Sequence, residues 1–240
     1  MKKAIYIILF SFVLIACAST DDEEIDPFLE DSGNFTDSRD GKVYKWVRIG
    51  EQIWMAENLA FLPTVYSPAS GSSSESRYYV YGYTGSDVAA GKQNENYIKF
   101  GVLYNWPAAK TASPPGWHLP TDEEWKQLEM FLGMTQDQVN ALGFRGDEHG
   151  LLLKATTTWN KNGHGTDSLG FTALPGGLLG SSEGFINIGT GGYWWTITEN
   201  SSLEALDRGL YWSVPRVNRY NMSKEYGFSV RCVKDYEIKY

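Results

Sequence analysis

The side chains with the clearest capacity for chemistry are two cysteines and three histidines: Cys17, Cys232, His118, His149 and His164. A cysteine nucleophile needs a lowered pKa and solvent access. Cys232 instead lies in the apolar, strand-like stretch SVRCV, which predicts a small buried side chain. No two histidines have the three- or four-residue spacing of a helical metal site. The sequence therefore predicts no metal site and no cofactor, and a structural hydrogen-bonding role for His118.

A serine-containing pattern also calls for a test. Residues 180–184 (Gly-Ser-Ser-Glu-Gly) fit the G-x-S-x-G pattern of hydrolase nucleophile elbows. Such an elbow needs a strand before the serine and a helix after it. The following residues, FINIGTGGYWW, are β-branched, aromatic and glycine-rich and have no helical periodicity. We therefore do not expect a serine hydrolase.

Cys17 belongs to a segment with different chemistry. Lys2 and Lys3 precede an uncharged run, AIYIILFSFVLIA, which is typical of a signal peptide and short for a transmembrane helix. The run ends in Leu-Ile-Ala-Cys (14–17), which resembles a bacterial lipobox, where the cysteine is acylated and becomes the N-terminus. We expect removal of residues 1–16 and a lipid anchor on Cys17 in the outer membrane. The alternative is an ordinary secretory signal with an accidental cysteine.

An acidic segment follows. Residues 18–40 hold nine acids and one base, whereas residues 41–240 hold 20 acids and 18 bases. The net charge of −8 thus belongs mostly to this leader, and the body has no basic excess with which to bind nucleic acid. We interpret residues 17–40 as a lipidated tether. Its acidic run resembles the surface-export signals of Bacteroidota lipoproteins and indicates exposure at the cell surface; a merely solvated tether is the alternative (Asp21, Asp22, Glu23, Glu24).

Short elements must position the side chains of the body. KVYKWVRIG and QIWMAEN, on either side of the break at Gly50, predict a β-hairpin. A capping box at Thr121–Glu124 predicts a helix that ends at Gly133, and a second box at Thr135–Gln138 predicts a helix that ends at Gly143. The side chains expected to face inward from these helices are Trp125, Leu128, Phe131, Leu132, Val139 and Leu142.

Glycine-punctuated aromatic segments surround these two main helices and predict short antiparallel strands and long loops. The fold class is therefore α+β, with a single domain over residues 41–240. The tryptophans of its recurrent blocks are expected in the core (Trp46, Trp54, Trp117, Trp125, Trp195).

Six blocks of this body resemble the Fibrobacter succinogenes major paralogous domain, a family of secreted and surface proteins without an established activity. The blocks are DGKVYKWVRIGEQIWMAENL (40–59), YNWPAA (104–109), PPGWHLPTDEEWKQL (114–128), GFTALPGG (170–177), YWWTIT (193–198) and GFSVRCVKD (227–235).

WHLPTDEEWKQLE and GFSVRC also resemble the formylglycine-generating-enzyme superfamily. That resemblance implies a C-type-lectin-like fold with long loops and with termini that meet in a sheet. Enzymes of that superfamily need a cysteine pair shortly before the last strand, and residues 213–226 contain no cysteine. The Glu-Pro-Asn and Trp-Asn-Asp signatures of calcium-dependent lectins are also missing. We therefore expect neither this oxidase chemistry nor another enzymatic activity.

Aromatic and basic side chains remain as candidates for ligand contact. One group lies in an expected loop or edge strand: Tyr78, Tyr79, Tyr81 and Tyr83. The other lies at or within residues 213–226, which we expect to be a long exposed loop: Tyr211, Trp212, Arg216, Arg219 and Tyr220. Replacing Arg216, Arg219 and Tyr220 should then weaken binding without loss of folding.

These features favour a surface-anchored, non-catalytic binding or adhesion domain with a glycan or protein ligand. Two alternatives stay open. One is an enzyme acting on extracellular polysaccharide, which would need two carboxylates across a cleft. The other is a structural envelope component without a small ligand.

Overall fold

The computed structural model describes residues 31–235 of the chain. The expected signal peptide (1–16), the lipidation site Cys17 and the acidic run from Asp21 to Glu24 lie outside the described residues. Their expected roles therefore stay predictions.

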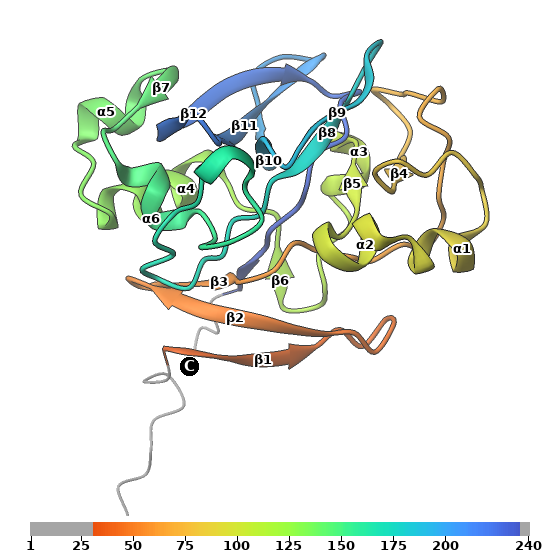
Figure 1. Cartoon of the computed structure of the whole chain (residues 1–240), viewed down its shortest axis with the longest axis horizontal. Coiled ribbons are helices and arrows are strands. Elements are labelled where there is room, and N and C mark those ends of the chain that lie inside the picture. The colour runs from red at the N-terminus through yellow and green to blue at the C-terminus, as the bar shows by residue number, and fades with distance from the viewer. Residues whose placement is uncertain (1–30, 236–240) are drawn as a thin grey trace, which may run out of the picture. The chain divides into compact units, whose positions relative to one another are not determined.

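A five-stranded sheet holds both ends of the described chain, in the order β1-β2-β3-β13-β6 (Figure 1). Its strands are β1 (Ser32–Thr36), β2 (Val43–Ile49), β3 (Gln52–Met55), β6 (Trp117–His118) and β13 (Val233–Lys234). The predicted hairpin is confirmed, since Val47 of β2 lies opposite Trp54 of β3. The last strand pairs with the same β3, through Val233 and Trp54.

The folded body begins earlier than the sequence predicted, because the end of the expected tether is a strand. β1 pairs with β2 from Ser32 opposite Val47 to Thr36 opposite Val43. Phe35 anchors it by stacking on Trp117, with ring centroids 4.3 Å apart. The turn that follows is also folded: Asp37 is buried and its carboxylate accepts hydrogen bonds from the Arg39 guanidinium. The acidic composition of this segment gave no indication of the apolar contact of Phe35 or of the partly buried ion pair.

A six-stranded sheet has the order β7-β12-β11-β10-β8-β9. It lies at the top of Figure 1, opposite the hairpin of β2 and β3 at the bottom. Its strands are β7 (Gly143–Arg145), β8 (Gly176–Gly180), β9 (Gly184–Ile188), β10 (Gly191–Glu199), β11 (Glu204–Tyr211) and β12 (Val214–Ser223). Every neighbouring pair is antiparallel except β8 and β10. A third sheet consists of β4 (Tyr78–Tyr79) and β5 (Leu103–Tyr104). The chain is therefore sheet-rich α+β, as predicted.

The expected loop over residues 213–226 is wrong, because most of it is the long strand β12. This strand pairs with β11 on one side and with β7 on the other. Its sequence, VPRVNRYNMS, has polar side chains on both faces, so the usual alternation of apolar and polar residues is hidden. The buried side of the strand holds Val217 and an ion-paired arginine, Arg219.

The two capped helices are confirmed as α4 (Asp122–Phe131) and α5 (Gln136–Asn140), each with a complete capping box. Two inward assignments are wrong, since Phe131 is 57% exposed and Leu142 is 53% exposed. Phe131 lies in the last turn of α4 and covers the backbone of Gly50 at the surface. Leu142 follows the end of α5, so helical periodicity does not predict the direction of its side chain. The remaining helical segments are α1 (Val88–Gln93), α2 (Glu95–Phe100), α3 (Trp106–Ala109), α6 (His149–Leu153) and the 3₁₀ turn Asn160–Asn162.

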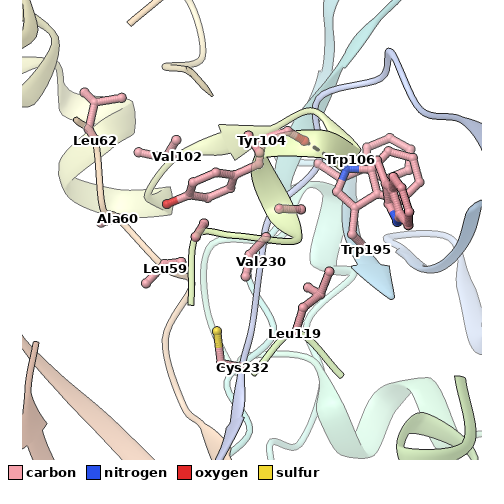
Figure 2. Close-up of a cluster of buried hydrophobic side chains, with 14 of the residues drawn as sticks. Leu59, Ala60, Leu62, Val102, Tyr104, Trp106, Leu119, Trp195, Val230 and Cys232 are labelled. Carbon is pink, nitrogen blue, oxygen red and sulfur yellow. Dashed lines mark hydrogen bonds between the residues drawn. The ribbon is translucent and has the colours of Figure 1, made fainter. Parts of the chain in front are cut away.

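A large apolar cluster fills the space between these elements (Figure 2). Two of its tryptophans donate their indole N–H groups to backbone oxygens: Trp106 donates to Thr196 and Trp195 to Tyr104, at 2.9 and 2.8 Å. Cys232 is fully buried here, and burial raises the pKa of its thiol to about 12. The expected burial of Cys232 is confirmed. Of the five tryptophans expected in the core, Trp46 alone is only partly buried.

Asn58 joins three of the sequence blocks through four hydrogen bonds. Its side-chain oxygen accepts from the Trp194 indole at 2.9 Å and from the Arg231 guanidinium at 3.1 Å. Its amide donates to the Phe100 carbonyl at 3.0 Å and to the Ser229 hydroxyl at 3.2 Å. A buried amide with all these partners fixes the relative position of β10, the final segment and the segment that follows the first hairpin.

Candidate functional site

A groove of about 340 Å³ lies over strands β8 to β12 of the six-stranded sheet. We call it the sheet groove. Its lining consists of four tyrosines, three hydrogen-bonding side chains and three apolar ones: Tyr193, Tyr211, Tyr220 and Tyr226; Glu183, Asp207 and Asn218; Leu178, Ile186 and Met222.

Strand register brings these side chains together. Asp207 of β11 lies opposite Tyr220 of β12, and Gly209 lies opposite both Asn218 of β12 and Tyr193 of β10. Directly paired residues and residues two apart share one face of a sheet. Gly209 allows the Tyr211 ring and the Asn218 side chain to approach the backbone closely at the centre of this face, since a Cβ atom there would lie 3.2 Å from the Tyr211 ring and 3.4 Å from Asn218 Cβ. A glycine inside a strand commonly marks such a close approach.

The tyrosine rings support one another. Tyr193 and Tyr211 meet edge to face with centroids 5.5 Å apart, and Phe144 packs edge-on against Tyr211 at 5.3 Å. Asn187 donates a hydrogen bond to the Tyr193 hydroxyl at 2.8 Å. Burial raises the pKa of both Tyr193 and Tyr211, so their hydroxyls stay neutral. The groove wall is therefore aromatic, uncharged and held in place by packing.

Asp207 is the acidic group beneath this wall. The residue is 4% exposed, and its Oδ1 atom has no hydrogen-bond partner among the described residues. Burial raises the pKa of Asp207 to about 7, although Arg208 and the backbone amide of Tyr220 oppose the shift. A carboxyl group with a free acceptor, close to its titration point at neutral pH, is characteristic of a functional site.

The opposite face of β11 and β12 carries a buried ion network against α4. Glu129 of α4 accepts from Arg208 at 2.7 Å and also pairs with Arg145 of β7. Asp122, at the start of α4, pairs with Arg208 at 2.9 Å and with Arg219 at 2.7 Å. Burial alone would raise the pKa of Asp122, but the two guanidinium groups outweigh it and hold that pKa well below its usual range. This network fixes the helix to the back of the sheet groove.

The structure divides the second group of predicted contact residues between these two faces. Tyr211 and Tyr220 line the sheet groove, and Tyr220 is 55% exposed. Arg219 is not a free contact residue, because both ends of its guanidinium bind Asp122. Its removal would disturb the buried network, so we now expect the triple variant to be less stable than the unmodified chain.

The other two residues of that group lie beside the groove. Arg216 is exposed, with its guanidinium 5.6 Å from the centre of the Phe144 ring. Trp212 is partly buried, and Lys161 lies over its ring at 4.7 Å. Neither lines the sheet groove.

The first tyrosine group does not line the sheet groove either. Tyr79 is fully buried, so its assignment as a surface candidate is wrong. Tyr78 packs edge-on against Tyr104 at 5.7 Å, and Tyr81 packs against Phe185 at 5.0 Å. Tyr83 donates a hydrogen bond to the carbonyl of Asp87. These side chains hold the β4–β5 region together.

His118 and the serine-containing pattern at residues 180–184 have structural surroundings. His118 is held between Glu124 at 2.7 Å and Asp235 at 2.6 Å, and the hydrogen bond to Glu124 raises the pKa of its imidazole. Its predicted hydrogen-bonding role is confirmed. Residues 180–184 connect β8 to β9, so a strand follows the serines where an elbow has a helix. Within residues 31–235, no group of three or more His, Cys, Asp or Glu side chains could hold a metal ion. The same range contains no helix with the length and hydropathy of a membrane span.

Comparison of the sequence with protein-family models identifies the family of this chain. Residues 47–234 match the family model described as Fibrobacter succinogenes major domain. The chain belongs to this family. No curated protein and no solved structure matches the chain. Membership of the Fibrobacter succinogenes major domain family therefore identifies the body of the chain, and the role of the sheet groove has to be argued from its own chemistry.

Of the groove residues, only Tyr211 and Tyr220 were predicted from the sequence, and Asp207 and Glu183 are the acidic ones among those missed. Asp207 stands in EALDRGLY, where positions 205, 207, 209 and 211 share a face. That alternation was the available signal. The alternation alone does not show that Asp207 is buried, because its burial depends on the pairing of β11 with β12. Glu183 was considered only as part of the serine pattern.

Proposed function

We propose that this protein is a lipid-anchored, surface-exposed binding protein and that its sheet groove binds carbohydrate. The observation that carries the proposal is the combination of four tyrosines with Asp207, Glu183 and Asn218 in one groove. Sugars present apolar C–H faces and rings of hydroxyl groups. Aromatic rings pack on the C–H faces. Carboxylate groups accept hydrogen bonds from the hydroxyl groups, and amide groups both donate and accept them.

The size of the groove sets the scale of the ligand. Pockets for small molecules usually measure about 300–1,000 Å³. At about 340 Å³ the sheet groove stands at the lower end of that range, which suits a short stretch of a glycan. The neighbouring exposed side chains Phe144 and Arg216 extend the contact surface beyond the groove itself.

The proposed location at the cell surface is supported by the N-terminal sequence before the folded domain. The lipobox-like tetrad ending in Cys17 supplies an anchor, and the acidic run after it supports export to the outer face of the outer membrane. We also propose a distant relationship to C-type-lectin-like folds. It is supported by the first and last strands sharing one sheet and by the long segments between short strands.

Glycan arrays probed with the acyl-free chain from residue 18 onward test the binding proposal. Binding should decrease when Tyr211 and Tyr220 are both replaced by alanine. Phe131→Ala is the matched control, since Phe131 is as exposed as Tyr220 but lies outside the sheet groove. Equal loss in the control, or no sugar bound by the unmodified chain, would refute the proposal. A dominant protein partner in an outer-membrane pull-down would favour adhesion.

A second candidate function has one specific observation in its favour. Asp207 and Glu183 line the same groove, and a carboxyl with a raised pKa can act as a general acid in glycoside hydrolysis. Release of new reducing ends from a bound glycan, abolished by Asp207→Asn, would establish an enzyme. Binding without release would exclude it for that glycan.

A further inference from the structure

We propose that the sheet groove selects sugars that carry a protonated amino group, such as unacetylated 2-amino-2-deoxyhexose residues. This inference rests on the proposed carbohydrate binding and specifies its chemical class.

The charge of the groove is the first argument. Two of the side chains that line it are acidic, Glu183 and Asp207, and none is lysine, arginine or histidine. An ammonium group would lie near the Glu183 carboxylate and would favour the ionised form of Asp207. A uronate or sulfate group would meet like charge and find no lining base with which to pair.

Two nearby basic groups are engaged elsewhere, and a third, the exposed Arg216, lies beside the groove and is not part of its lining. Arg208 points to the other face of β11 and pairs with Glu129 and Asp122. Lys154 donates to the carbonyl of Tyr211 at 3.1 Å and lies 5.2 Å from the centre of the Trp159 ring. These partners keep positive charge out of the groove lining.

The free acceptor of Asp207 is the second, independent argument. Its Oδ1 atom is buried without a partner in the part of the chain that the structure describes. Buried acceptors are normally satisfied, and an unsatisfied one is unfavourable. An ammonium group brings three donors, so it can supply the missing hydrogen bond together with a compensating charge.

The tyrosines are the third argument. Aromatic rings attract cations through the negative charge of their faces, and rings combined with acids are the usual recognition elements for ammonium groups. The rings of Tyr193, Tyr211, Tyr220 and Tyr226 border the same space as the two acids. The C–H face of the sugar and its ammonium group can therefore both be bound there.

Isothermal titration of the acyl-free chain with matched tetrasaccharides tests the inference. The three probes are β-1,4-linked tetramers of glucosamine, N-acetylglucosamine and glucose, which share linkage and length. We expect the glucosamine tetramer to bind at least about tenfold more tightly than either neutral tetramer near pH 6.5, which corresponds to about 1.4 kcal/mol. Equal affinities would overturn the charge selectivity while leaving carbohydrate binding intact. Failure of all tetramers and of a glycan array would refute the proposed function itself.

Two variants locate the effect. Asp207→Asn should remove most of the preference for glucosamine, measured as the ratio of the affinities of the glucosamine and glucose tetramers for the same variant. Glu183→Gln, at an exposed position, should reduce the preference without affecting folding. Phe131→Ala should change neither the preference for glucosamine nor the affinity for the glucose tetramer. A preference that persists in both acidic variants would overturn the assignment to these carboxylates.

Proton release gives a readout that packing changes would not mimic. Because burial raises the pKa of Asp207 to about 7, an ammonium ligand should displace its proton near that pH. Titrations in buffers of different ionisation enthalpy should show this release for the glucosamine tetramer. The Asp207→Asn variant should release fewer protons on binding the same tetramer. Equal release from both proteins would contradict direct pairing.

Discussion

Replacing Asp207 with asparagine should make the protein's stability depend less on pH. The carboxyl is buried in the folded chain, and burial raises its pKa from the ordinary 3.8 to about 7. Between these two pH values the folded state keeps a proton that the unfolded state has lost. Stability contributed by this group is therefore fully present below about pH 4 and decreases as pH rises from there through 7.

The magnitude follows from the shift. About three pKa units, at 1.36 kcal/mol per unit, correspond to about 4 kcal/mol between pH 4 and pH 8. Asparagine has nearly the same shape and does not titrate. The free energy of unfolding of Asp207→Asn, minus that of the unmodified chain, should therefore increase by about 4 kcal/mol over this range.

Urea denaturation followed by tryptophan fluorescence at several pH values measures this difference. Groups that titrate alike in both proteins cancel in the subtraction, which isolates the buried carboxyl. Glu123→Gln controls for the loss of one negative charge, since the side chain of Glu123 is 73% exposed on α4. A difference that stays constant with pH, or decreases as pH rises, would refute the burial argument.

Three further predictions concern other parts of the chain. Glu129→Ala should lower the free energy of unfolding by about 3–5 kcal/mol in chemical denaturation, because it leaves the buried Arg145 and Arg208 without their shared carboxylate; a loss below about 1 kcal/mol would mean that the network is replaceable. Cys17→Ala should abolish incorporation of a fatty-acid analogue, and label retained in this variant would refute the anchor. Alanines at positions 21–24 should preserve lipidation but protect the protein from protease applied to intact cells; unchanged cleavage would show that the acids serve only as a tether.

Local signals explain what could be predicted from the sequence. A capping box consists of residues three apart, so Thr121 and Thr135 identified both helices with their first residues. The hairpin of β2 and β3 was equally visible, because its strands are adjacent in sequence and alternate. Cys232 could be assigned to the interior because the residues around it are apolar.

Non-local pairing explains what was missed. β12 becomes a central strand only through β7, which lies about 70 residues earlier in the chain. β1 carries few apolar residues, and its place depends on Phe35 meeting Trp117 from a distant segment. The burial of Asp207 follows from the same long-range pairing, since Tyr220 of β12 lies opposite it. No window of sequence contains this information.

The alternation of β12 places the buried ion network and the proposed binding surface on opposite faces of one strand. Arg219 and Val217 face α4 and the buried network, whereas Asn218, Tyr220 and Met222 line the sheet groove. Neighbouring residues of the strand thus act on different sides of the sheet, although they are adjacent in sequence. Substitutions at 217 and 219 should lower stability, and substitutions at 218 and 220 should change ligand affinity. The network also holds Arg208 on the back of β11, directly after Asp207, so the ion pairs that stabilise α4 keep a positive charge away from the groove that we expect to bind a cation.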